Sequence, residues 1–152
     1  MLKLLHTGDL HLGRGYQKQE QENPALARRY REARLEALEA VIRLAGEERC
    51  DALVIAGDVF DTHTLNPGLV QTVAQLLSGC ACPVVVLPGN HDYCEGGEDR
   101  LWNRFRECAG ENTLLLTEPT PTEVGVGSVS SRVFSPAHSR NRFHSRSSAP
   151  SQ

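Results

Sequence analysis

Residues 52–58 decide the fold, and they read ALVIAGD in one-letter code. An apolar run without alternation that ends in a Gly-Asp turn is typical of a strand buried on both faces of a parallel sheet. The same arrangement of an apolar run and a glycine-containing turn occurs at residues 2–6 and 83–87, and a shorter apolar run covers 113–116. The sequence therefore predicts four strands, at least three of which end in polar turns.

Helical patterns separate these strands. The clearest helix is predicted over residues 25–49, because Asn23 suits the N-cap and Pro24 the first helical position. Further helices are predicted at 67–78 and 99–109. The face of the first helix that we expect to be buried consists of Tyr30, Ala33, Ala37, Val41 and Leu44, widened by Leu35, Leu38, Ile42 and Ala45. Alternating strands and helices, joined by right-handed crossovers, predict an α/β fold with a parallel sheet covered by helices on both faces.

Length and charge suggest one domain followed by a tail. The chain has 152 residues, which suits a single domain. Residues 1–123 carry 12 Lys and Arg against 19 Asp and Glu, a net charge of −7, whereas residues 124–152 carry four Arg and no acid. An acidic body is not expected of a protein that holds nucleic acid by charge alone. We predict a domain over 1–123 and a disordered Ser/Arg-rich tail over 124–152.

The cysteines and the apolar runs bear on the cellular compartment. The sequence has five cysteines, an odd number, and no Cys-x-x-Cys, which indicates reduced thiols in a cytoplasmic protein. No apolar run approaches the ~18–20 residues that span a bilayer. The first residues, MLKLLH, turn polar too soon for a secretory signal peptide. We therefore expect no membrane partner.

Chemically active side chains gather in three turns that follow the predicted strands. These turns read GDLH at residues 8–11, GDVFD at 57–61 and GNHD at 89–92. In open α/β sheets, ligands bind at the carboxyl ends of the strands. The side chains that we expect to meet at one point are Asp9, His11, Asp58, Asn90 and His91.

The residue types in these turns predict a divalent metal site. Carboxylate and amide oxygens together with imidazole nitrogens favour Mn²⁺ or Fe²⁺, and they also suit Zn²⁺ and Mg²⁺. The set contains no cysteine, which argues against a structural zinc site. Asp58, on the middle strand, is placed to bridge two ions ~3.5–4 Å apart. Each turn alone is commonly structural, but three at consecutive strand ends indicate a site that holds a phosphate.

These motifs resemble those of the calcineurin-like metallophosphoesterases. The longer strings are LHTGDLHLG at 5–13, IAGDVFD at 55–61 and VLPGNHD at 86–92. They are similar to the branch that contains the nuclease subunit of the bacterial SbcCD complex and related DNA repair exonucleases. The resemblance covers residues 1–117 and implies the first half of a two-sheet sandwich.

The resemblance also implies roles for individual residues. The expected metal ligands are Asp9 and His11 for the first ion, Asp58 as the bridge, and Asn90 for the second ion. His91 is expected to act as general acid or to stabilise the leaving oxygen, and Asp92 to orient His91. The implied reaction is hydrolysis of a DNA phosphodiester by a metal-activated water, usually with Mn²⁺. The implied partners are DNA and a long ATPase chain of the SbcC type.

The sequence also departs from the family pattern. The family's second half supplies further histidines, including a Gly-His-x-His segment, and neither His138 nor His144 lies in such a segment. We expect either a truncated product or a reading-frame shift near residue 124. Four ligands on one sheet edge predict weak binding of one ion, low stability and little or no activity. Half a sandwich also predicts an exposed apolar sheet face through which copies self-associate.

Two other functions stay open at this point. One is a phosphomonoesterase or cyclic-nucleotide phosphodiesterase of the same superfamily. The other is a non-catalytic remnant or interaction module, which the absent histidines favour. Binding of a nucleotide cofactor is excluded, because no Gly-x-Gly-x-x-Gly follows a strand and no Gly-Lys-Ser/Thr loop occurs.

Overall fold

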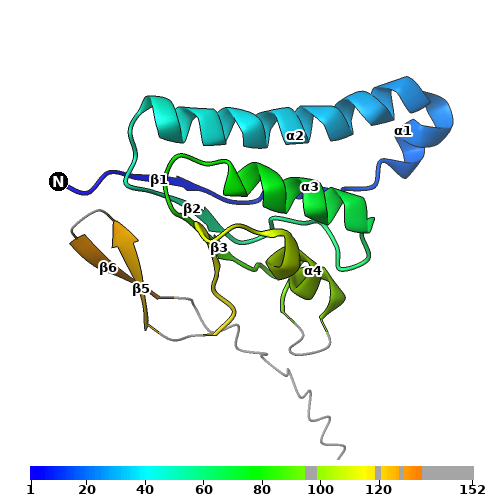
Figure 1. The fold of residues 1–152 in the computed structure, drawn as a ribbon. Coiled ribbons are helices and arrows are strands. Elements are labelled where there is room, and N and C mark those ends of the chain that lie inside the picture. The colour runs from blue at the N-terminus through cyan, green and yellow to red at the C-terminus, as the bar shows by residue number, and fades with distance from the viewer. Residues whose placement is uncertain (95–98, 119–120, 127–128, 135–152) are drawn as a thin grey trace, which may run out of the picture.

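A computed structural model of the chain describes residues 1–94, 99–118, 121–126 and 129–134 (Figure 1). Along the chain, the elements are β1 (Leu4–Thr7), α1 (Gln17–Glu22), α2 (Pro24–Glu47), β2 (Ala52–Ala56), α3 (Pro67–Ser78), β3 (Val84–Leu87), α4 (Arg100–Cys108), β4 (Thr113–Leu115), β5 (Pro121–Val126) and β6 (Val129–Phe134).

The four predicted strands form one parallel sheet in the order β1-β2-β3-β4. Leu5 pairs with Leu53, and Ile55 pairs with Val86, so the carboxyl ends of β1, β2 and β3 lie side by side. All four residues of β3 are buried, as expected for a strand covered on both faces. The predicted α/β class and parallel sheet are confirmed.

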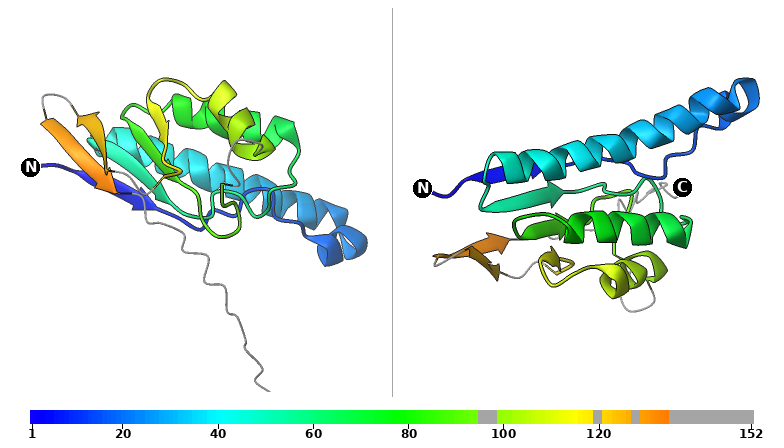
Figure 2. Two further views of the ribbon diagram at one scale, coloured as in Figure 1. Left: turned by 90° about the horizontal axis from the view of Figure 1, so that it is seen from below. Right: turned by 45° about the horizontal axis from the view of Figure 1, so that its top comes forward.

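The helices lie on one face of this sheet (Figure 2). Buried residues of α2, α3 and α4 form one cluster with Leu53 and Ile55 of β2 and with Val84 and Val86 of β3. Because the strands follow one another in chain order, each right-handed crossover returns on the same side. The predicted placement of helices on both faces is therefore wrong for the described helices. Helices cover both faces of a parallel sheet only when the strand order reverses within the sheet, and the hydrophobic pattern does not reveal the strand order.

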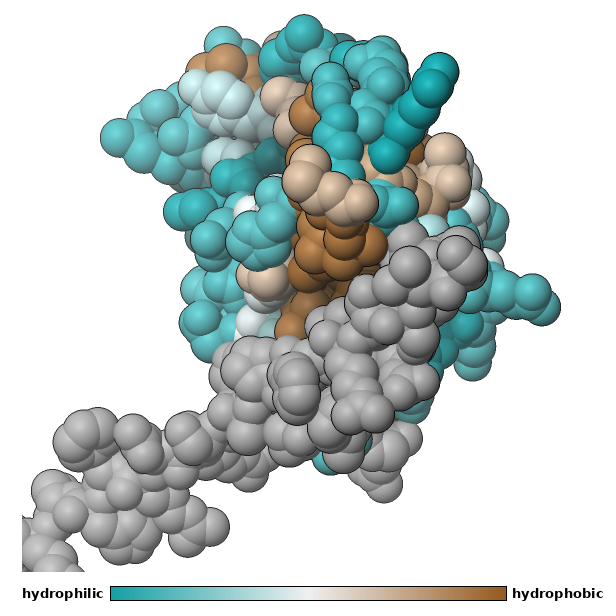
Figure 3. All heavy atoms as spheres, turned by 90° about the vertical axis from the view of Figure 1, so that its left-hand side faces the viewer, coloured by the Kyte–Doolittle hydropathy of each residue, from teal (hydrophilic) through white to brown (hydrophobic). Residues whose placement is uncertain are grey.

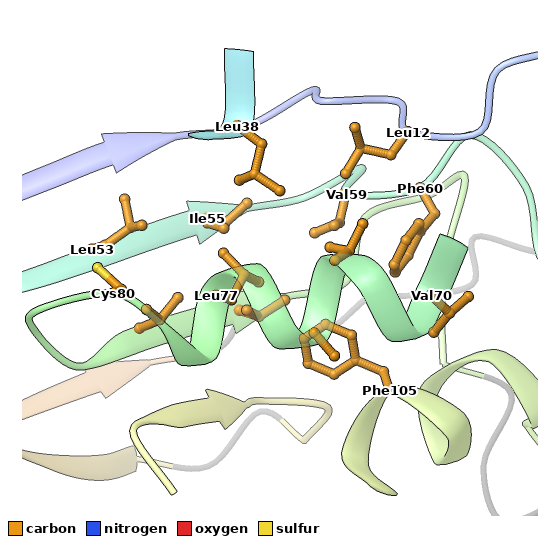
Figure 4. Packing of buried hydrophobic residues seen from close by; sticks show 14 of the residues in the cluster. Leu12, Leu38, Leu53, Ile55, Val59, Phe60, Val70, Leu77, Cys80 and Phe105 are labelled. Carbon is orange, nitrogen blue, oxygen red and sulfur yellow. The ribbon is translucent and has the colours of Figure 1, made fainter. Parts of the chain in front are cut away.

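The main core lies between α3, α4 and the sheet (Figure 4). Phe60, Trp102 and Phe105 are fully buried, and the ring centroids of Phe60 and Trp102 are 5.6 Å apart. The Trp102 and Phe105 rings are 5.4 Å apart and edge-on, which is a favourable aromatic geometry. Phe60 belongs to the GDVFD turn, so this aromatic cluster fixes one of the three polar turns from below.

Helix α2 buries only part of the predicted face. Leu38 and Ala45 are buried, and Leu35, Val41 and Ile42 are half-buried against the core. The exposed residues of the predicted face are Tyr30, Ala33, Ala37 and Leu44. The prediction that these four are buried is wrong. Because α2 carries apolar residues around much of its circumference, helical periodicity alone does not choose which stripe packs inward.

The helix starts follow the predicted chemistry. The Asn23 side chain accepts a hydrogen bond from the Leu26 N–H at 3.1 Å, and Pro24 occupies the first turn. The short helix α1 was not predicted, because its sequence QKQEQE has no apolar period. An ion pair of 2.6 Å between Glu20 of α1 and Arg31 of α2 joins the two helices.

Strands β5 and β6 form an antiparallel hairpin in which Val126 pairs with Val129. Residues 124–126 and 129–134, which the sequence prediction assigned to the tail, belong to this hairpin, and residue 123 lies within β5. The missed signal is two valine-containing runs separated by Gly127-Ser128, a pair typical of hairpins. The tail prediction for 135–152 lies outside the described residues.

The face of the four-stranded sheet that lies opposite the helices is only partly exposed. Val85 and Leu87 are buried there, whereas Leu4 on the edge strand β1 is 53% exposed. Figure 3 looks at the end of the sheet where the strands begin and shows apolar residues gathered in a strip. Among the described residues, no helix is long and apolar enough to cross a bilayer.

All five cysteines are unpaired, as predicted. The Sγ atoms of Cys80 and Cys82 are 3.7 Å apart in the core, and burial, together with this contact, raises the pKa of the Cys82 thiol to about 12. Since the thiolate is the reactive form, we expect iodoacetamide to label half-buried Cys94 and Cys108 well before Cys82 in the native chain at pH 8. Mass spectrometry of timed digests measures the order, and a denatured sample, in which the rates converge, is the control. Early labelling of native Cys82 would contradict the packing described here.

Candidate metal centre

The three polar turns meet at the carboxyl edge of the sheet, at the right-hand end of β1, β2 and β3 in Figure 1. Backbone hydrogen bonds connect them: the Asp9 N–H donates to the Gly57 carbonyl at 3.1 Å, and the His11 N–H donates to the Asp58 carbonyl at 2.9 Å. The Gly57 N–H donates to the Leu87 carbonyl at 2.9 Å. These bonds continue the sheet beyond its strands and hold the turns in fixed relative positions.

Glycine is required where two turns approach most closely. A Cβ atom on Gly89 would lie 2.0 Å from Asp58 Oδ1 and 2.2 Å from the Asp58 nitrogen. A Cβ atom on Gly8 would lie 2.6 Å from the Ala56 carbonyl oxygen. The turn after β3 (GNHD, residues 89–92) therefore lies directly against Asp58, in the turn after β2. Only a residue without a side chain lets the two turns come this close.

Three residues of these turns have left-handed backbones. Asp9 has φ 53°, His11 φ 45° and Asp58 φ 50°. In the described part of the chain, Arg49 is the one other non-glycine residue with positive φ. Such conformations cost free energy and gather at functional sites. The backbone thus identifies two of the three turns that the side-chain chemistry identifies.

Asp9, His11 and Asp58 form the first group that can hold a cation. One ligand atom from each lies within 4.8 Å of the others. His11 Nε2 is 3.9 Å from Asp9 Oδ1 and 4.0 Å from Asp58 Oδ2. These distances are too long for hydrogen bonds, but two ligands of one cation with bonds of about 2.1 Å can be up to about 4.2 Å apart. The donor set therefore fits a divalent metal ion.

His11, Asp61 and His91 form a second group of the same kind. His11 Nδ1 lies 3.0 Å from Asp61 Oδ1, and the His11 and His91 rings meet edge-on with centroids 4.8 Å apart. Asp61 was not among the predicted site residues. Its signal was present in the sequence, because it is the second acid of the GDVFD turn.

His91 is positioned by both acids of that turn. Its backbone N–H donates to Asp58 Oδ1 at 2.9 Å, and its ring Nδ1 lies 3.2 Å from the Asp61 carbonyl oxygen. A carbonyl oxygen only accepts, so this contact places a proton on Nδ1. The Nε2 atom of this exposed residue is then the ring atom available to a ligand.

Comparison with known proteins places this site in a family. The family model for the calcineurin-like phosphoesterase matches residues 2–140. The chain belongs to the calcineurin-like phosphoesterases. This confirms the resemblance drawn from the three turns.

Several curated relatives match this chain over most of its length. The DNA double-strand break repair protein Mre11 of Halobacterium salinarum is 37% identical over 124 residues, 78% of this chain and 29% of that protein. The SbcD component of the nuclease SbcCD of Escherichia coli K12 is 34% identical over 96 residues, 60% of this chain and 21% of that protein. Its counterpart in Bacillus subtilis is 30% identical over 134 residues, 81% of this chain and 30% of that protein. The chain thus spans less than a third of each of these relatives.

Two further polar residues follow these strands: Asn90 lies after β3, and His63 lies after the GDVFD turn. Asn90 is exposed on the β3 turn, next to His91. The His63 ring packs edge-on against Tyr93 with centroids 4.4 Å apart, and its Nε2 atom is buried without a hydrogen-bond partner. Neither of the two cation-binding groups found among the described residues includes His63.

Asp92 has a different task from the predicted one. It is fully buried, and its carboxylate accepts the Gly89 N–H at 2.5 Å and the Phe60 N–H at 2.9 Å. Burial raises the pKa of this carboxyl, and the two backbone N–H groups oppose the rise. The sequence predicted that Asp92 orients His91. The structure shows that its carboxylate instead joins the β2 turn to the β3 turn, so it affects His91 through the backbone.

Proposed function

We propose that this chain is the N-terminal part, residues 1–123, of the catalytic domain of a metal-dependent phosphodiester hydrolase that acts on DNA. The observation that carries the proposal is the meeting of Asp9, His11 and Asp58 within 4.8 Å at the carboxyl edge of the sheet. The family match and the printed names of relatives, a DNA repair protein and nuclease subunits, support DNA as substrate.

Two divalent cations are proposed, with Mn²⁺ preferred over Mg²⁺, Fe²⁺ or Zn²⁺. Asp9 and His11 would hold the first ion, Asp58 would bridge both, and Asn90 would hold the second. The mixed oxygen and nitrogen donors support this choice of metals. When bound, divalent ions supply Lewis acidity at phosphorus and lower the pKa of water at the site.

His91 is proposed to act with both ring nitrogens protonated: the Nδ1 proton stays on the Asp61 carbonyl oxygen, and the Nε2 proton passes to the leaving oxygen. Its Nδ1 lies 3.2 Å from the Asp61 carbonyl oxygen, so Nε2 is the ring atom left for a substrate. The Asp58 carboxylate holds the backbone of His91 at 2.9 Å. One acid thus both contributes to the proposed cation site and fixes the proton donor, which keeps the two at a constant separation.

The proposed shell is incomplete on this sheet edge alone. Four ligands would hold one ion weakly, and two close positive charges would need further ligands. We therefore propose low or no activity for the isolated chain. An ATPase chain of the SbcC type as partner is supported by the relatives named as subunits of SbcCD. The unpaired cysteines support a cytoplasmic location, and Leu4 supports self-association through the exposed sheet face.

Asp58→Asn tests the proposal. Asparagine tolerates the left-handed backbone and can still accept the His91 N–H, so the turn should persist while one ligand charge is lost. We expect Mn²⁺ affinity, measured by titration calorimetry, to fall by about a hundredfold. Removing a group that only supports a metal ligand costs up to about a hundredfold, and the loss of a ligand charge should cost at least as much. Any low Mn²⁺-dependent hydrolysis of linear duplex DNA by the unchanged chain should be absent in this variant.

Glu39→Gln is the matched control, because Glu39 is an exposed acid on α2 outside the cation-binding groups. It should bind Mn²⁺ as the unchanged chain does. Equal affinity in Asp58→Asn would refute the cation site. Hydrolysis of a small phosphomonoester without any of DNA would refute the substrate, and robust DNA turnover would refute low activity. A folded chain that binds no Mn²⁺ would favour an interaction module.

A further inference from the structure

Arg14 is an unpaired cation beside the proposed cation site. In residues 1–94 and 99–118, nine of the twelve Lys and Arg side chains form an ion pair or a hydrogen bond within the domain. The three that form neither are Arg14, Arg49 and Arg100, and all three are exposed. Arg14 differs from the other two because it lies in the segment that directly follows the polar turn after β1.

Backbone hydrogen bonds hold Arg14 close to the site. The Arg14 N–H donates to the His11 carbonyl at 3.3 Å, which closes a turn and keeps the two Cα atoms within about 7 Å of each other. Leu12, inside this turn, is buried, and its N–H donates to the Val59 carbonyl at 2.9 Å. The Asp61 N–H donates to the Leu12 carbonyl at 3.0 Å. The backbone at Arg14 is therefore connected to the turns after both β1 and β2.

The conformation of this turn depends on a glycine. Gly13 has φ 80°, a left-handed value that favours glycine, and a Cβ atom there would overlap the Leu65 side chain. The turn thus lies directly against the segment that leads into α3. Gly15 follows Arg14, and nothing lies within 4 Å of a Cβ atom at that position. The backbone is therefore fixed before Arg14, and the surface beyond it is open.

We propose that Arg14 binds a backbone phosphate of DNA, next to the phosphate that the cation site holds. This inference rests on the DNA-directed function proposed above. Successive phosphates of one DNA strand are about 3.4 Å apart along the helix axis, so a neighbouring phosphate lies within reach of a long side chain that starts beside His11. The planar guanidinium can donate two parallel N–H groups to two phosphate oxygens.

Such a contact separates DNA from small phosphoesters. A phosphomonoester has one phosphate and leaves Arg14 without a partner, whereas a DNA strand supplies both phosphates. The contact also works against repulsion, because residues 1–123 carry a net charge of −7 and DNA is a polyanion. A phosphate contact positions the strand without reading its bases. Arg14 is therefore a specificity-determining residue of the proposed hydrolase, for polymer and not for sequence.

Arg14→Gln tests this contact. We expect the dissociation constant of the full 152-residue chain for a short fluorescein-labelled DNA duplex, measured by fluorescence anisotropy with Mn²⁺ at low KCl concentration, to rise about tenfold. The slope of the logarithm of affinity against the logarithm of KCl concentration should fall in magnitude by about 0.9, the share of one phosphate contact. Arg14→Lys keeps the charge but loses the planar fork, so it should keep the slope and lose only part of the affinity.

Arg49→Gln is the matched control. Arg49 is also exposed and unpaired, but it lies between α2 and β2, at the opposite end of the sheet, so its loss should leave the affinity for the duplex unchanged. Unchanged duplex affinity in Arg14→Gln overturns the Arg14 contact alone, and so does an equal loss in Arg49→Gln, which would indicate general charge attraction. A loss of Mn²⁺ affinity in Arg14→Gln, measured by titration calorimetry, also overturns it, because Arg14 would then support the cation site. An unchanged chain that binds Mn²⁺ but no duplex refutes the DNA substrate and this contact with it.

Discussion

Gly89→Ala is expected to destabilise the fold by about 3 kcal/mol or more and to abolish divalent cation binding. The new Cβ atom would lie 2.0 Å from Asp58 Oδ1 and 2.2 Å from the Asp58 nitrogen. A backbone atom cannot swing aside as the end of a side chain can, so the β3 turn must move away from the β2 turn. That movement breaks the hydrogen bond from the His91 N–H to Asp58 at 2.9 Å.

The measurement is thermal unfolding followed by Mn²⁺ titration. For a chain of this size, a loss of about 3 kcal/mol lowers Tm by roughly 10 °C. Gly15→Ala is the control, because nothing lies within 4 Å of a Cβ atom at Gly15. It should change stability by no more than about 0.5 kcal/mol. Gly89→Ala with an unchanged Tm and intact Mn²⁺ binding would show that the two turns are not in contact.

The parts of this structure that follow local rules were predictable. Apolar runs without alternation predict buried parallel strands, and β2 and β3 are such strands. Asn23 accepts the Leu26 N–H as an N-cap should, and a polar turn after each strand follows from the chemistry of sheet edges. The predicted meeting point of the turns needed only the parallel order of β1, β2 and β3.

The parts that depend on tertiary choice were not predictable. The side on which each helix packs depends on strand order, and a hydrophobic run carries no information about its neighbours. Helix α2 offers two apolar stripes, and only packing shows that Leu38 is inside and Tyr30 outside. The hairpin of β5 and β6 was not predicted, because the serine and arginine content of this region is typical of a tail and outweighs its few valines.

Within the site, residue type predicted which acids and imidazoles lie in the polar turns, but not which atoms their side chains contact. Asp61 was missed because the motif alone does not show whether its carboxylate faces the site or the solvent. The structure shows its Oδ1 atom 3.0 Å from His11 Nδ1. Asp92 was predicted to orient His91, because the two residues are adjacent in sequence. In three dimensions, its carboxylate reaches back to the backbone of Phe60, which lies 32 residues away.

Asp92→Ala is expected to be the most destabilising substitution of a charged residue in the described domain, costing about 3–4 kcal/mol. The Asp92 side chain accepts two backbone N–H groups, from Gly89 and Phe60, and both of these residues are buried. Alanine leaves both donors without a partner where water has no access, and each such donor costs about 1–3 kcal/mol. Part of this cost is offset, because a buried carboxyl with a raised pKa no longer has to be desolvated.

Trp102 provides the readout for this experiment. It is the one tryptophan of the chain, and its Nε1 donates to the Asp92 carbonyl at 2.5 Å. Denaturant titration followed by tryptophan fluorescence gives the free energy of unfolding of each variant. Asp92→Asn should lose only about half as much as Asp92→Ala, because the amide oxygen can accept one N–H while the amide nitrogen opposes the other.

Asp51→Ala separates burial from hydrogen bonding. Asp51 also accepts a backbone N–H, from Lys3 at 2.6 Å, but this bond is exposed and lies at the opposite end of the sheet. Water can replace the lost acceptor there, so we expect a change of no more than about 1 kcal/mol. Equal losses of the free energy of unfolding in Asp51→Ala and Asp92→Ala would show that the buried hydrogen bonds of Asp92 stabilise the fold no more than an exposed hydrogen bond does. A large loss only in Asp92→Ala would identify a buried carboxylate, outside the proposed ligand set, as the group that holds the cation-binding turns together.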